Sequence, residues 1–153
     1  ELAAHFGAHV TGVSSAANLD LVRQQGAERA LDYNSAEYTK DITQYDVVVD
    51  TVGKTHWKNH LFRVKPAGTI ALVAAGALKT LYLPLLQPFY KPRLVALVAS
   101  EKRIDLAFIR DLAEQGKLRP VIDRTYPLEQ IAEAHRYVEQ GHKRGNVVIS
   151  VGR

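Results

Sequence analysis

The sequence lacks cysteine, and that absence excludes disulfide scaffolds, thiol catalysis and every cysteine-ligated zinc site from these 153 residues. It also lacks any apolar run of the roughly 18 residues that a membrane-spanning helix needs, and no signal-peptide pattern stands at its start. Methionine is missing too, position 1 included. We therefore expect that the sequence does not begin at a native start.

The chain also lacks a large excess of charge of either sign. The 20 basic and 16 acidic residues leave a net charge of +4, and the basic residues are scattered along the chain rather than gathered in a stripe. A groove for polymeric nucleic acid would need such a stripe, whereas a single bound phosphate would not. We expect no nucleic-acid partner, no membrane partner and, because nothing directs the protein elsewhere, a cytoplasmic location.

What is present is the pattern of an α/β domain. Hydrophobic residues make up 46% of the chain and charged residues 24%, as in ordinary globular proteins. Short β-rich runs alternate with helical patterns, which predicts right-handed βαβ units: a Rossmann-like parallel sheet with helices on both faces. Strands are expected at 9–13, 29–33, 46–50, 69–74, 94–99, 121–122 and 146–151.

The connecting segments follow from capping residues and breakers. Helices are expected after position 19, closed by Gly26, and at 36–43 (capped by Ser35), 54–64, 104–115 and 128–140. Residues 78–92 carry three prolines and are expected to form a loop with at most short helical pieces. The apolar runs at 46–50 and 69–74 predict strands buried on both faces.

A set of stretches, in this order and spacing, carries a family resemblance. They are HFGAHVTGV at 5–13, LVR at 21–23, GA at 26–27, LDY at 31–33, DVVVDTVG at 46–53, GKLRPVI at 116–122 and the segment 126–146. On these residues the chain resembles the medium-chain dehydrogenase/reductase superfamily, in particular its zinc-less branch similar to quinone oxidoreductases. The resemblance spans nearly the whole chain.

The resemblance implies an NADPH-dependent oxidoreductase that reduces a quinone, an enone or a related small carbonyl compound by hydride transfer, as a homo-oligomer. It implies that this chain is the C-terminal part of that enzyme. Residues 1–119 would be a partial dinucleotide-binding domain without its first strand and glycine-rich turn. Residues 120–153 would return to the catalytic domain, where their last strand pairs outside this chain. Catalytic residues are expected in the N-terminal part, so we name none.

The cofactor site is predicted from the ends of strands. In a dinucleotide fold, an acidic residue after the second strand binds the ribose 2′-hydroxyl and repels a 2′-phosphate. Residues 13–18 read VSSAAN, with no carboxylate before Asp20. The resemblance implies that Ser15 and Tyr33 hold the 2′-phosphate of NADPH, and that Asn18 stands where the family often has lysine. A capping role for Ser15 and sheet packing for Tyr33 are the structural alternatives.

Four further positions complete the predicted cofactor set. The resemblance places Val52 and Gly53 near the adenosine and Arg144 in a stretch that closes over the cofactor. Ala74, at the end of the strand at 69–74, would face the nicotinamide. A turn capped by Thr51 or Asp50, tight packing at Ala74 and a solvated charged turn at 142–144 are the alternatives.

A metal site is not predicted. His56 and His60 have the i, i+4 spacing of a ligand pair, but Trp57 stands where the zincin motif needs glutamate. We interpret this segment as a solvent-facing helix with Trp57 on the core side.

Two other functions stay open. One is a zinc-containing alcohol dehydrogenase with the same cofactor domain, which stoichiometric zinc in the full-length protein would favour. The other is a non-enzymatic module that binds NADPH or a protein partner. Tight cofactor binding without turnover would favour that module.

We expect residues 1–153 alone to bind NADPH weakly, because no glycine-rich turn in them brings backbone N–H groups to the pyrophosphate. The strands at 9–13 and 46–50 should also each keep an edge without a ladder partner. Titration of the isolated chain with NADPH checks the first expectation. Binding in the low-micromolar range would contradict it.

Overall fold

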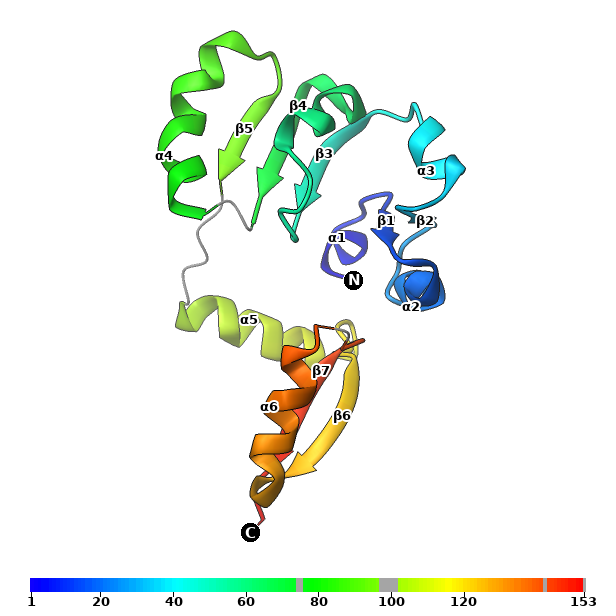
Figure 1. The fold of residues 1–153 in the computed structure, drawn as a ribbon, viewed down its shortest axis with the longest axis vertical. Coiled ribbons are helices and arrows are strands. Elements are labelled where there is room, and N and C mark those ends of the chain that lie inside the picture. The colour runs from blue at the N-terminus through cyan, green and yellow to red at the C-terminus, as the bar shows by residue number, and fades with distance from the viewer. Residues whose placement is uncertain (74–75, 97–101, 142, 153) are drawn as a thin grey trace. The chain divides into compact units, whose positions relative to one another are not determined.

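The strands that the structure describes all pair in parallel. The computed structural model describes residues 1–73, 76–96, 102–141 and 143–152 (Figure 1). The parallel sheets are β1 (Thr11–Ser14) with β2 (Arg29–Asp32), then β3 (Tyr45–Asp50), β4 (Val64–Leu72) and β5 (Arg93–Ala96), then β6 (Ile122–Pro127) with β7 (Asn146–Ser150). This arrangement confirms the predicted α/β class.

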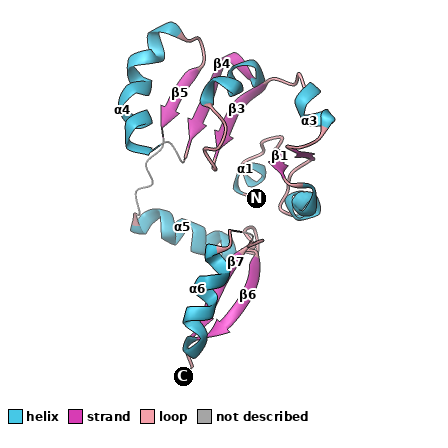
Figure 2. Cartoon of the chain, in the orientation of Figure 1, coloured by secondary structure: helices cyan, strands magenta, loops and turns pink. Residues whose placement is uncertain are grey.

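Helices connect the strands along the chain (Figure 2). The α-helices are α1 (Leu2–His5), α2 (Leu19–Gln24), α3 (Ala36–Lys40), α4 (Gly76–Leu86), α5 (Arg103–Glu114) and α6 (Ile131–Glu139). Short 3-10 helices are η1 (Ala16–Asn18), η2 (Trp57–Arg63), η3 (Gln87–Phe89) and η4 (Leu128–Gln130). In the described part of the chain, no helix has the length and apolarity to cross a bilayer.

The chain divides into two compact units. One comprises Glu1–Thr39 together with Arg103–Arg153, and the other comprises Lys40–Lys102. Contacts hold the two segments of the first unit together: the Arg119 N–H donates to the Glu1 carboxylate at 2.9 Å, and Phe6 stacks on Phe108. The division into 1–119 and 120–153 stays a prediction.

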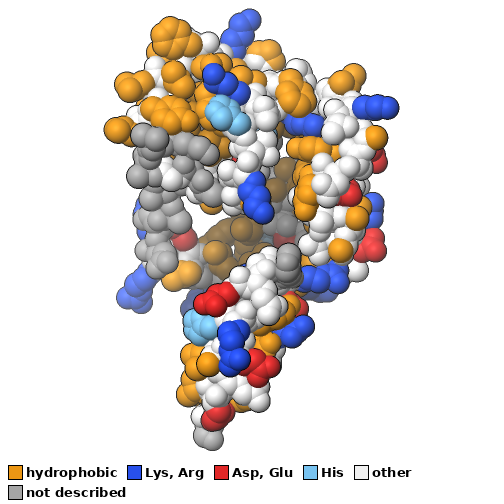
Figure 3. Space-filling model, in the orientation of Figure 1, with side chains coloured by type: hydrophobic (Ala, Val, Ile, Leu, Met, Phe, Trp, Pro, Cys, Tyr) orange, Lys and Arg blue, Asp and Glu red, His pale blue; other side chains and the backbone are white. Residues whose placement is uncertain are grey.

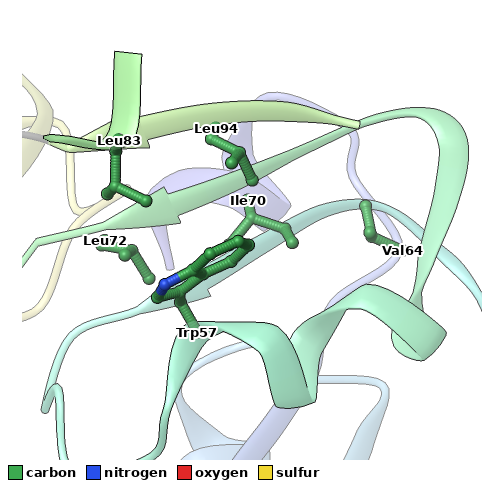
Figure 4. Close-up of a cluster of buried hydrophobic side chains, with 6 residues drawn as sticks. All are labelled: Trp57, Val64, Ile70, Leu72, Leu83 and Leu94. Carbon is green, nitrogen blue, oxygen red and sulfur yellow. The ribbon is translucent and has the colours of Figure 1, made fainter. Parts of the chain in front are cut away.

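Trp57 is the centre of the core in the unit Lys40–Lys102. Its indole is 1% exposed and packs with side chains of β4 and α4, among them Ile70, Leu72 and Leu83 (Figure 4). The ring of Tyr90 meets it edge-on, with 5.1 Å between ring centroids. Trp57 therefore joins η2 and α4 to one face of the three-stranded sheet.

Burial on both faces holds for β4 but not for β3. Ile70, Ala71 and Leu72 are buried in succession, as predicted. In β3, by contrast, Val48 packs against the core, whereas Val47 and Val49 are each 55% exposed. Within the unit Lys40–Lys102, Trp57 and Leu83 cover the opposite face of the sheet and no described element covers these two valines, so burial of β3 on both faces is not observed in this unit.

Two connecting elements differ from expectation. Residues 57–63 form a 3-10 helix instead of an α-helix over 54–64, and Pro66 lies inside β4 instead of ending a helix. The expected loop at 78–92 is largely α4, which contains Pro84. Proline costs a helix one hydrogen bond, but Leu83 in the same turn is fully buried in the core. Tertiary packing thus outweighs the local breaker signal.

The last strands also differ. β6 extends over Ile122–Pro127 instead of two residues, and it pairs with β7. This pairing occupies one edge of β7, and its other edge has no partner among the described residues, so pairing of the last strand outside this chain stays a prediction. At 94–99 the strand is described only as far as Ala96. Positions 97–99 lie outside the described residues.

β1 and β3 each keep one edge without a strand partner among the described residues. Among the described residues, β1 pairs only with β2, and β3 pairs only with β4, so each of them lies at the edge of its sheet. This agrees with the expectation of unpaired ladder groups at both strands.

One region of the surface is rich in exposed apolar side chains. Leu81, Leu85 and Phe89 are each more than 70% exposed, and apolar side chains gather over this α4–η3 region (Figure 3). Lys and Arg side chains are dispersed over the same view.

We predict that Gly68→Ala lowers the free energy of unfolding by about 1–3 kcal/mol. The pairing of β3 with β4 is irregular between Tyr45 and Val47, and a Cβ at Gly68 would lie 2.6 Å from the Asp46 carbonyl oxygen. Urea unfolding measures the loss. Gly152→Ala is the control, since a Cβ there would meet no atom within 4 Å. Equal stability of the two variants would contradict the close approach.

Candidate functional site

The segment that follows β1 has hydrogen-bonding groups but no carboxylate. We call residues 14–18 together with Tyr33 the β1 rim. Ser15 precedes η1, yet its side chain makes no capping hydrogen bond, so the capping alternative is not observed. Asn18 closes the turn by donating its N–H to the Ser15 carbonyl at 2.9 Å. The first carboxylate, Asp20, is largely exposed and pairs with Arg23 at 3.0 Å.

Tyr33 lies beside this segment because β1 and β2 are parallel neighbours. Its backbone N–H donates to the Ser14 carbonyl at 3.1 Å. The residue is 52% exposed, so it is not packed away on the sheet. Its phenol is therefore accessible at the carboxyl ends of the two strands, where ligands bind in open α/β folds.

Arg144 brings a positive charge to the β1 rim from the far end of the sequence. Its Nε donates to Asn18 Oδ1 at 3.0 Å, and its Nη2 donates to the Ala17 carbonyl at 2.8 Å. These bonds use only part of the guanidinium fork, which carries further N–H donors. A guanidinium in this setting suits a phosphate, because it can donate two parallel hydrogen bonds to phosphate oxygens.

The turn after β3 is held by Asp50. Its Oδ1 accepts from the N–H groups of Val52 at 3.0 Å and Gly53 at 2.8 Å, and its Oδ2 lies 3.2 Å from His60 Nε2. Gly53 has a φ of +70°, a backbone conformation that glycine adopts without strain. The capping alternative for Asp50 is thus observed. The turn presents Val52, which is 65% exposed.

Asp50 and His60 form a nearly buried pair, with side chains that are each 10% exposed. Burial disfavours the ionised Asp50, but hydrogen bonds from the Gly53 N–H, His60 and the Val52 N–H outweigh burial and lower the pKa of this carboxyl. The expectation that His60 faces solvent was wrong, because this bond draws it inward. Trp57 is on the core side, as predicted.

The histidine pair does not form a metal site. His60 is engaged with Asp50, while the Nδ1 of His56 accepts from the Lys58 N–H at 3.3 Å. In the parts of the chain that the structure describes, no three His, Asp or Glu side chains come together as ligands. The donor set of these residues therefore does not fit a zinc ion.

The predicted cofactor residues fall into two groups. Ser15, Asn18, Tyr33 and Arg144 come together in one compact unit, through the bonds just described. Val52 and Gly53 belong to the other unit. Ala74 lies outside the described residues.

Sequence reasoning missed two anchoring carboxylate contacts. His60 pairs with Asp50 from ten positions away, a spacing with no motif. Asp123 accepts a hydrogen bond from the backbone of Arg144 at 2.7 Å, and no local pattern indicated this.

The chain is similar to several known proteins. A family described as "zinc-binding dehydrogenase" matches residues 25–149. The mitochondrial NAD(P)H oxidoreductase RTN4IP1 of Mus musculus is 34% identical over 95% of this chain and 42% of its own length. The chloroplastic quinone-oxidoreductase homolog of Spinacia oleracea is 30% identical over 97% of this chain and 47% of its own length.

A solved structure shows the same fold. The quinone oxidoreductase from Coxiella burnetii superposes with a TM-score of 0.82 at 26% identity, covering 99% of this chain and 47% of that protein. The chain thus spans about half the length of the curated relatives it matches.

We predict that Asp50→Asn flattens the acid limb of the stability curve. The pKa of Asp50 is lower in the folded protein than its usual value of 3.8, so its ionised form stabilises the fold above that value. This contribution is lost as the pH falls through the folded-state pKa. Asparagine keeps an acceptor oxygen but cannot ionise. Urea midpoints measured from neutral pH down to acid pH should therefore fall less steeply in the variant.

Asp105→Asn on α5 removes an exposed carboxylate and is the matched control. It should leave the acid dependence of the wild type unchanged. If the Asp50 variant instead follows the wild-type curve, the turn does not depend on an ionised carboxylate.

Proposed function

Because the chain belongs to the zinc-binding dehydrogenase family of the medium-chain dehydrogenase/reductase superfamily, we propose that the protein is an NADPH-dependent oxidoreductase. It reduces a quinone, an enone or a related small carbonyl compound. The observation that carries the cofactor assignment is the Arg144 guanidinium on the carboxylate-free β1 rim.

Preference for NADPH over NADH follows from charge at the rim. A carboxylate after the second strand would bind a ribose 2′-hydroxyl and repel a 2′-phosphate. Here the next carboxylate along the segment after β1, Asp20, is engaged with Arg23, and Asp32, which is the β2 partner of Ser14, accepts a hydrogen bond from the Asn34 N–H. Arg144 supplies the positive charge, and the side chains of Ser15, Asn18 and Tyr33 can donate hydrogen bonds to phosphate oxygens.

The remaining residues position the cofactor. When bound, the nicotinamide supplies the hydride that is transferred to the substrate. The turn fixed by Asp50 presents Val52 and Gly53 to the adenosine side, where the absence of a Cβ at Gly53 allows close approach. Ala74 facing the nicotinamide belongs to the same proposal.

Substrate, assembly and location rest on the relatives. Their names include quinone oxidoreductases, which supports a quinone or a similar activated carbonyl compound as the substrate. We assign no catalytic residue within this chain, and a homo-oligomer is part of the proposal. The named relatives are mitochondrial and chloroplastic, so a cytoplasmic location stays a prediction.

The family description implies zinc, but the proposal assigns it no role in this chain. The donor groups of the described residues do not form a ligand set, and the sequence contains no cysteine.

We predict that Arg144→Ala, in the protein encoded by the complete gene, raises the KM for NADPH about 10- to 100-fold and leaves the KM for NADH nearly unchanged. Hydrogen bonds to a charged group contribute about 1.5–3 kcal/mol, and about 1.4 kcal/mol corresponds to tenfold in affinity. Steady-state oxidation of each cofactor with a simple quinone measures both constants.

Lys143→Ala is the matched control, since it removes the same charge from the neighbouring position. It should change the KM for NADPH far less than Arg144→Ala does. If both cofactors lose affinity equally in the Arg144 variant, the guanidinium does not read the 2′-phosphate and the assignment to NADPH fails.

A further inference from the structure

Asp123 at the start of β6 joins three elements through one oxygen. Its Oδ2 accepts from the Tyr137 hydroxyl on α6 at 2.8 Å and from the backbone N–H of Arg144 at 2.7 Å. The pKa of the Asp123 carboxyl is lowered, mainly by the hydrogen bond from the Arg144 N–H and next by the bond from the Tyr137 hydroxyl. The acceptor is therefore ionised at neutral pH.

Tyr137 is itself held in place. The guanidinium of Arg124 lies over its ring, 3.9 Å from the ring centroid, as in a cation–π contact. Both parts of the Tyr137 side chain are therefore held in place, the ring by Arg124 and the hydroxyl by Asp123. Arg124, Tyr137 and Asp123 form a bracket, which we call the Asp123 bracket.

The loop that carries Arg144 rests on this bracket and on the end of the preceding segment. The Asn146 N–H donates to the Val121 carbonyl at 2.7 Å, two residues beyond the Arg144 anchor. Between them, a Cβ at Gly145 would lie 2.6 Å from that same Val121 oxygen, so the backbone is in close contact there. The Cα of Arg144 is therefore fixed from both sides.

A fixed Cα matters because the arginine side chain is long and flexible. Holding this side chain on Asn18 and Ala17 costs conformational entropy. If its Cα is already fixed, less conformational entropy is lost when a ligand binds. The carboxylate of Asp123 contacts only the Arg144 backbone and Tyr137 in the bonds described, and not the guanidinium. Its effect on the β1 rim is therefore indirect.

We propose that Asp123 is a positioning residue for cofactor selection: it holds the Arg144 backbone so that the guanidinium reaches the β1 rim and the 2′-phosphate bound there. The proposal rests on the proposed function. It adds that selectivity between NADPH and NADH depends on a carboxylate that touches neither the cofactor nor the guanidinium.

The test uses Asp123→Ala in the protein encoded by the complete gene. We expect the KM for NADPH to rise about 3- to 10-fold, with the KM for NADH within about twofold of wild type and kcat unchanged, since binding of the 2′-phosphate alone is impaired. A pure charge effect predicts the opposite sign, because loss of a nearby negative charge would favour the phosphate. Tighter NADPH binding, or an equal loss with both cofactors, would overturn the proposal.

A double-mutant cycle separates this proposal from the proposed function. Once Arg144→Ala has removed the guanidinium, adding Asp123→Ala should change the ratio of the two KM values no further. If Arg144→Ala alone leaves that ratio unchanged, the proposed function fails. If Arg144→Ala changes the ratio but Asp123→Ala does not, only the positioning role fails.

Two more variants guard against a folding defect. Tyr137→Phe removes one donor to Asp123 but leaves its bond to the Arg144 backbone, so it should lower thermal stability and keep the NADPH preference. Asp123→Glu keeps the charge and moves the acceptor by one methylene, so it should reduce the preference even if Asp123→Ala does not fold. A wild-type preference in Asp123→Glu would contradict the proposal.

Discussion

The contact of the Arg144 guanidinium with Asn18 and Ala17 joins segments that lie more than 120 positions apart in the sequence. It is a hydrogen-bonded contact at the surface, so it adds little to the stability of the fold by itself. What it adds is location: a permanent positive charge stands at the end of β1, where a dinucleotide fold distinguishes its two cofactors. The proposed function depends on this placement.

The two groups of predicted cofactor residues, one in each compact unit, depend on the same kind of contact. In each, a carboxylate accepts hydrogen bonds from the backbone, from two N–H groups at Asp50 and from one at Asp123, and so fixes a loop that can meet a ligand. Asp50 holds the turn at Val52 and Gly53, and Asp123 holds the loop at Arg144. Neither carboxylate needs to touch a ligand. Loops are the mobile parts of a fold, and bonds from an ionised acceptor to their backbone limit that mobility where binding requires order.

Much of the fold could be predicted from the sequence, because β3 and β7 contain runs of apolar β-branched residues and α2 and α5 are each followed by a glycine. The failures share a physical cause. Pro84 predicts a loop, yet α4 passes through it because Leu83 packs in the core. The exposed valines of β3 depend likewise on which face the helices cover. Such outcomes are decided by tertiary contacts that no local pattern encodes.

The candidate site, too, could be predicted from the sequence only in part. Asn18 and Arg144 could each be named from the family resemblance, but their direct bond spans 126 positions and only the folded chain reveals it. Asp123 carried no signal at all, since an aspartate next to a strand is ordinary. Residue identity was therefore accessible from the sequence, and the partnership between residues was not.

The single tryptophan of this sequence has a practical consequence for watching the chain unfold. Trp57 is buried in the core of the unit Lys40–Lys102, so the intrinsic fluorescence of the indole reports the melting of that unit alone. Far-ultraviolet dichroism sums the helices and strands of both units. Where the two optical signals coincide, the units unfold as one cooperative body, and where they separate, each melts on its own.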